Sequence, residues 1–163
     1  MPIVSGDIVY RLSGGASNTD PAASLGGAKS STAAGNYFDD VSSAEATAGD
    51  VEYRCVYVHN GHGTLALQGA KIWIQTQTPS ADTDVAIGLG TSAVNGTEQT
   101  VADESTAPSG VTFSAPSNFA GGLAIGDIPA GQHKAVWVRR TVNAAAAGAS
   151  DTFTLRAQGD TNP

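Results

Sequence analysis

His59 and His62 flank the turn HNGHG, where two imidazoles three residues apart could bind a metal ion from a hairpin tip. The sequence offers no evident third ligand and no supporting partner for either ring. We therefore expect solvated turn histidines. Cys55, the only cysteine, lies in an apolar stretch with no motif for thiol chemistry, so we expect a buried structural thiol and no internal disulfide.

Paired carboxylates are the second kind of side chain that could do chemistry. Asp82 and Asp84 resemble part of a calcium-binding loop, but the D-x-D-x-D-G spacing is not completed. The acidic pairs at 39–40 and 103–104 are adjacent, so their side chains point apart, whereas general acid–base catalysis needs carboxylates that converge. No nucleophile or phosphate-binding motif is present. We predict that the chain is not an enzyme and has no cofactor and no metal.

Alternation of apolar and polar side chains recurs along the whole chain and predicts the elements that would position any site. Stretches rich in Val, Ile, Thr and aromatic residues are predicted as β-strands; these are 7–12, 51–60, 70–77, 84–90, 110–115, 133–142 and 151–158. Turn-forming Gly, Pro, Asn and Asp residues separate them. The pattern predicts an all-β, antiparallel β-sandwich, and we favour an immunoglobulin-like topology over a jelly roll.

Helical potential is weak. Residues 42–50 could form one or two turns, with Ser43 as the cap and Gly49 as the end. The alanine-rich stretch 143–150 is short and uncapped, and we predict a loop there. The stretch 51–60 is apolar on both faces, which is typical of a central strand. The predicted core consists of Tyr53, Cys55, Tyr57, Ile72, Ile74, Val136, Val138, Phe153 and Leu155.

The composition limits the classes of partner. The net charge of −7 over 163 residues argues against direct binding to nucleic acid or to anionic membrane surfaces, which need clustered Lys and Arg. No apolar run has the length of a signal peptide core or a membrane-spanning helix. We expect a soluble protein made in a reducing cytoplasm, with a single domain covering residues 1–163.

Residues 13–36 contain only one large apolar side chain, Leu25. Such a Gly/Ala/Ser-rich segment cannot bury enough apolar surface to order itself. We therefore expect a long N-terminal loop or arm over 13–50. Without a partner it would be disordered.

Two further features suggest contacts with other molecules. Trp73 points away from Ile72 and Ile74, so it faces outward if those isoleucines are core. It is then a candidate for the core of another layer, for a protein interface, or for a sugar-binding platform. Arg139 and Arg140 are adjacent basic residues in an acidic chain, and one of them must lie on an outer face.

Several stretches together resemble a known family. They are VYRLSGGASNTDPAASLGGAKSST, NYFDDVSSAEATAGDVEYRCVYVHN, TPSADTDVAIGLGTSAVNGTEQTV and IPAGQHKAVWVRRTV. This series is similar to small virion structural proteins of tailed bacteriophages and prophages. The resemblance runs over nearly the whole chain, and FDDVSSAEATAGDVEYRCVYV is its most specific part. The family brings no catalytic residues to carry over.

The resemblance implies a component of a phage particle, in which residues 13–36 could lie across neighbouring subunits. We expect a capsid decoration, or cement, protein on the outer capsid surface, forming trimers and binding the major capsid protein or other virion proteins. A tail, baseplate or fibre-associated module is the first alternative, and a carbohydrate-binding module using Trp73 is the second. The predicted interface residues are Leu25, Tyr37, Phe38, Trp73, Arg139 and Arg140.

Overall fold

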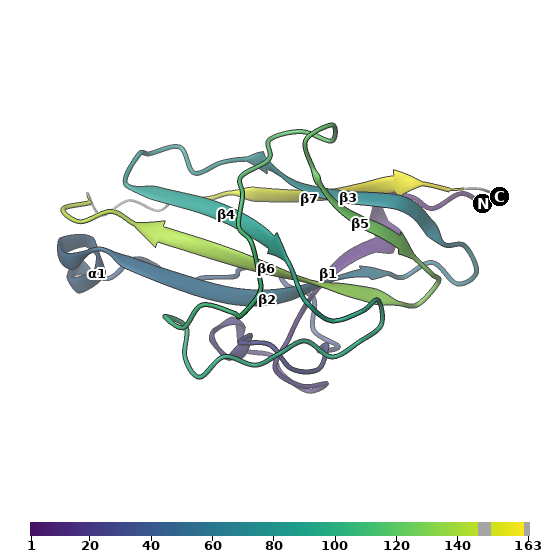
Figure 1. The fold of residues 1–163 in the computed structure, drawn as a ribbon, viewed down its shortest axis with the longest axis horizontal. Coiled ribbons are helices and arrows are strands. Elements are labelled where there is room, and N and C mark those ends of the chain that lie inside the picture. The colour runs from purple at the N-terminus through teal and green to yellow at the C-terminus, as the bar shows by residue number, and fades with distance from the viewer. Residues whose placement is uncertain (147–150, 162–163) are drawn as a thin grey trace.

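A computed structural model describes residues 1–146 and 151–161, which form two antiparallel sheets packed as a sandwich (Figure 1). The four-stranded sheet has the order β1 (Ile8–Leu12), β2 (Asp50–Asn60), β6 (His133–Val142) and β4 (Thr83–Leu89). The three-stranded sheet has the order β5 (Leu123–Ile128), β3 (Leu67–Thr76) and β7 (Thr154–Asp160). Short helical turns occur at η1 (Ser5–Asp7), η2 (Pro21–Ala23) and α1 (Ser43–Ala48). No helix in the described ranges is long and apolar enough to cross a membrane.

The predicted antiparallel sandwich is confirmed, but the immunoglobulin-like topology is not. In that topology the first, second, fifth and fourth strands share one sheet. Here the fifth and sixth strands have exchanged sheets, since β6 pairs with β2 and β4 while β5 pairs with β3. The predicted strand at 110–115 is only a single bridge, in which Ser114 and Ile87 exchange hydrogen bonds of 2.9 and 2.8 Å.

The weakly predicted helix at 42–50 is present as α1. Ser42, not Ser43, is its N-cap, and it forms a capping box with Glu45. Gly49 ends the helix with a φ of 80°, a conformation that other residues rarely adopt. The chain then enters β2 directly, which places α1 at one end of the sandwich (Figure 1). Part of the predicted loop at 143–150 lies outside the described residues.

The core between the sheets uses one face of each central strand. It contains Val56 and Val58 of β2, Val136 and Val138 of β6, and facing side chains of the other sheet. Of the predicted core, Ile72, Ile74, Val136, Val138 and Leu155 are confirmed, and Phe153 packs against this core while partly buried. Tyr53, Cys55 and Tyr57 lie instead on the opposite face of β2.

A second core covers that opposite face. Cys55, Tyr57, Ala135 and Trp137 are completely buried there, with Tyr53, Val101, Val111 and Phe113 packed against them. The cover consists of the loops 13–36 and 91–113, which gather on the side of β2 away from β3 and β7 (Figure 1). Both faces of β2 are therefore apolar because both are covered.

The expectation for residues 13–36 needs correction. The segment does not extend away from the domain, because its backbone is hydrogen-bonded to its own chain. The Leu12 amide donates to Thr32 O at 3.1 Å, and the Ala34 amide donates to Tyr10 O at 2.8 Å. These bonds continue the sheet past the free edge of β1. Composition alone suggested an unpartnered segment because it does not show that a sheet edge and an apolar face lie beside it.

Candidate docking face and the buried charged cluster

The loop layer is fixed to β2 by buried hydroxyl groups. The Tyr57 hydroxyl donates to Gly27 O at 2.6 Å and accepts the Glu98 amide at 2.9 Å, so it joins both loops. Ser13 Oγ donates to Cys55 O at 2.7 Å and accepts the Gly26 amide at 3.1 Å. These bonds satisfy polar groups of a segment that has few apolar side chains.

Glu98 is the charged centre of this layer and is only 3% exposed. Its carboxylate accepts the Thr91 amide at 3.1 Å, the Thr91 hydroxyl at 2.9 Å and the Ser92 amide at 2.8 Å. Burial by itself would raise the pKa of Glu98, but the hydrogen bonds from Ser92 and Thr91 lower it to about 2. Glu98 therefore stays ionised and holds the loop that covers Trp137.

Two predicted interface residues belong to this covered side. The Leu25 carbonyl accepts the Val101 amide at 2.9 Å, which connects the two loops. Arg139 lies on the outer face of β6, and its guanidinium stacks 5.3 Å from the centre of the Phe113 ring. Both residues contact their own chain in ways that stabilise the cover.

Three other predicted interface residues meet at the α1 end of the sandwich. Arg140 is 7% exposed, and its Nε donates to Glu52 Oε2 at 2.5 Å. Its guanidinium also lies 4.8 Å from the Phe38 ring centre and bonds Asp39 O at 2.5 Å. Tyr37 stacks on Phe153, and burial raises the pKa of Tyr37. The acidic partners of Arg140 thus lie in its own chain.

Trp73 occupies a third place, on the outer face of the β5-β3-β7 sheet. Ile72 and Ile74 face the core as predicted, so Trp73 faces outward, yet it is only 6% exposed. Phe119 covers it edge-on, with ring centroids 5.8 Å apart, and the Arg156 guanidinium lies 5.9 Å from its ring centre. Little of the ring is open for stacking on a sugar.

Phe119 is the exposed member of this group and was not predicted from the sequence. It is 40% exposed, and Lys71 Nζ lies 5.2 Å from its ring centre. Lys71 also donates to Ala120 O at 3.2 Å, which holds the turn beside β3. We call Lys71, Trp73, Phe119 and Arg156 the aromatic–cation patch. An isolated Phe in a loop gives no periodic signal, so only its contact with Trp73 identifies it.

The histidines take separate roles. His62 Nδ1 accepts the amides of Thr64 and Leu65 at 3.2 and 3.0 Å, so it organises the turn after β2. His59 lies opposite His133 in the β2–β6 pair, and burial lowers the pKa of both. No third ligand accompanies them in the metal-ligand groupings of the described ranges.

The six predicted interface residues therefore lie in three places and do not form one surface. The structure instead brings together two sets that the sequence did not suggest. One is the aromatic–cation patch, and the other is a group of three carboxylates, Glu45, Asp50 and Glu52, beside α1. Comparison of the chain with protein-family models, with curated proteins and with solved structures finds no match in any of the three.

Proposed function

We propose that this chain is a structural protein of a tailed-phage particle, a capsid decoration protein that binds the head surface through the aromatic–cation patch. The observation that carries the proposal is the exposed Phe119 ring, which packs edge-on against Trp73, with Lys71 beside Phe119 and Arg156 beside Trp73. Aromatic and arginine side chains clustered in this way are the usual energetic centre of a protein interface.

The rest of the three-stranded sheet suits a broad, flat contact. Its outward residues on β7 are Thr154, Arg156, Gln158 and Asp160, all exposed, and Lys71 lies opposite Gln158. No loop as long as those on the other sheet covers this face in the described structure. Polar side chains around a small aromatic centre form the rim-and-core pattern of protein–protein contacts.

Charge and sequence resemblance give independent support. The chain carries a net charge of −7, yet two of its eight Lys and Arg residues lie in the patch, Lys71 beside Phe119 and Arg156 beside Trp73. The patch therefore favours an acidic partner surface, whereas the remaining acidic surface suits the outside of a DNA-filled shell. The stretches that resemble virion structural proteins include β2 and β6, the central strands of the fold.

Attachment in many copies would not need high affinity for each one. Repeated weak contacts on a lattice add to high avidity, and a trimer would present three patches at once. We propose such a trimer, bound to the major capsid protein. A tail, baseplate or fibre-associated protein would use the same patch to bind a different partner. The number of copies per particle distinguishes this alternative from a decoration protein.

The test is quantitative mass spectrometry of purified particles, measured against the major capsid protein. A ratio near one to one is expected for a decoration protein. A ratio of a few per cent would assign the chain to the tail or portal. Complete absence from particles would overturn the virion proposal.

A matched pair of variants tests the patch itself. Phe119→Ala is expected to lower the number of copies per particle, because it removes the exposed ring. Val51→Ala is the control, because Val51 is a comparably exposed apolar residue at 36% and lies on β2, away from the patch. Equal loading of both variants would show that the patch is not the attachment face.

A further inference from the structure

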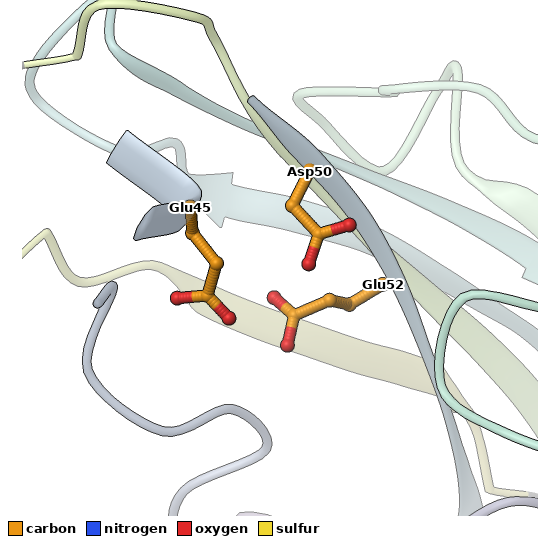
Figure 2. A group of neighbouring side chains, drawn as sticks. All are labelled: Glu45, Asp50 and Glu52. Atoms are coloured by element: carbon orange, nitrogen blue, oxygen red, sulfur yellow. The ribbon is translucent and has the colours of Figure 1, made fainter. Parts of the chain in front are cut away.

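Three carboxylates converge where α1 enters β2 (Figure 2). One ligand oxygen from each of Glu45, Asp50 and Glu52 lies within 4.8 Å of the others. Asp50 and Glu52 are two residues apart on β2, so they share the face that Val56 and Val58 turn toward the core. Glu45 reaches them from α1 because Gly49 reverses the chain between helix and strand.

Glu52 supplies a second and independent observation. It is 0% exposed, and its Oε2 accepts the Arg140 Nε at 2.5 Å. Its Oε1 is buried and accepts no hydrogen bond from any described residue. Arg54 Nη2 is 3.9 Å from Oε1, beyond hydrogen-bond distance, and lies only 2.5 Å from Glu104 Oε2. A buried carboxylate oxygen without a donor is costly and is rare in folded proteins.

The orientation of Glu52 directs this unsatisfied group toward the other two acids. Figure 2 shows the Glu52 side chain running from β2 toward Glu45, with the Asp50 carboxylate beside both. Neither Glu45 nor Asp50 forms an ion pair with a described Lys, Arg or His residue. Three carboxylates so close together repel one another unless a cation or a proton lies between them.

We propose that Glu45, Asp50 and Glu52 bind a divalent cation of calcium size, which joins α1 to the start of β2. Carboxylate oxygens are the ligands that hard cations prefer. The oxygen ligands of one Ca²⁺ lie at most about 5 Å apart, so three oxygens that are all within 4.8 Å of one another can contact the same ion. Ca²⁺ also accepts an irregular shell, whereas Mg²⁺ demands near-ideal octahedral geometry, and the half-buried Glu45 and Asp50 leave room for water to complete that shell.

The surrounding charges fit a cation. Arg140 pairs with Glu52 Oε2 and with Asp39, and Arg54 pairs with Glu104. Both arginines therefore have acidic partners other than Glu52 Oε1. A cation at Oε1 would supply the missing partner. The site lies at the opposite sheet from the aromatic–cation patch, so it is independent of how the chain attaches to a particle.

The test compares thermal melting and Ca²⁺ titration calorimetry for the full chain and three variants. Glu45→Gln keeps the capping box, because glutamine also accepts the Ser42 amide. Asp50→Asn keeps an acceptor for the Val51 amide. Asp84→Asn, an exposed acid on β4, is the matched control. The metal alone, as CaCl₂ after removal of cations by EDTA, is the probe.

We expect the order of the melting temperatures to reverse between EDTA and Ca²⁺. In EDTA, Glu45→Gln and Asp50→Asn melt above the unmodified chain because repulsion is relieved. In millimolar Ca²⁺ the unmodified chain melts above both, and each variant binds Ca²⁺ about tenfold or more weakly. Asp84→Asn follows the unmodified chain in both buffers. Absence of Ca²⁺ binding by the unmodified chain, or the same calcium response in all four proteins, would overturn the proposal. So would an equal response to Mg²⁺, because the site would then not select by size.

Discussion

The two outer faces of the sandwich differ in how far loops cover them. The outer face of the four-stranded sheet lies under the loops 13–36 and 91–113, where Trp137 is completely buried. On the outer face of the three-stranded sheet, the described residues place the turn at Phe119 over Trp73. One face is thus a second core, and the other remains available to a partner.

The difference shows how a segment with few apolar residues becomes ordered. The cover contributes little hydrophobic area of its own over 13–36, but it allows β2 and β6 to bury Tyr57 and Trp137. Its small side chains let backbone approach backbone, and buried hydroxyl groups such as Ser13 and Tyr57 satisfy the polar atoms. Gly and Ser are therefore structural here, since larger residues would hold the loops away from the sheet.

The largest expected effect separates the two tryptophans. Trp137→Ala should lower the free energy of unfolding by about 3–5 kcal/mol, because it opens a cavity under the cover. Trp73→Ala should cost about 2 kcal/mol, because its outer side packs against the partly exposed Phe119 ring and the exposed Arg156 side chain. Urea denaturation of both variants measures the difference. Equal losses would contradict the view that only one face is a second core.

A glycine pair tests the contact between the two covering loops. Gly26 has a φ of 98°, and a Cβ there would collide with Gln99 O of the other loop. Gly15 has a φ of 113° with open space around it. Both alanine variants carry backbone strain of about 1–2 kcal/mol, and Gly26→Ala should lose about 2 kcal/mol more from the collision. The same stability for both variants would show that the loops are not held together at Gly26.

Acidification should loosen the covered face through Glu98. Its pKa in the folded chain is about 2, below the ordinary value of 4.5, so its contribution is present above pH 4.5 and is lost as the pH falls toward 2. We expect Glu98→Gln to be less stable than the unmodified chain at pH 7 by about 2 kcal/mol. The difference in stability between Glu98→Gln and the unmodified chain should shrink when thermal melting is measured at pH values down to about 3. A gap that stays constant with pH would mean that the charge of Glu98 does not hold the cover.

The smallest effect on stability is expected at Phe119. Phe119→Ala should change the free energy of unfolding by less than about 1 kcal/mol, because the ring is 40% exposed. Phe113→Ala should cost about 2 kcal/mol, since Phe113 belongs to the cover and packs on Tyr53 and Arg139 of the sheet. Chemical denaturation of the two variants compares the faces directly. A Phe119 loss as large as that of Phe113 would indicate that Phe119 is part of a core.

The sequence by itself determined the class of fold and its central strands. Alternation rich in Val and aromatic residues predicted strands at 51–60 and 133–142, and apolar residues on both faces indicated that 51–60 is central; the corresponding β2 and β6 both lie inside the four-stranded sheet. The helix at 42–50 also followed from local signals. These features depend on neighbouring residues alone, so a single sequence is sufficient to predict them.

Only the tertiary structure decided which apolar face of β2 meets the other sheet. Alternation has a period of two, so exchanging the faces leaves the pattern unchanged, and Tyr57 was assigned to the wrong core for that reason. The same limit applies to the sites. Phe119 lies over Trp73, and Glu45 beside Glu52, only because turns and strand pairing bring them together. Contacts of that kind leave no periodic trace in the chain, and they carry both proposals made for this protein.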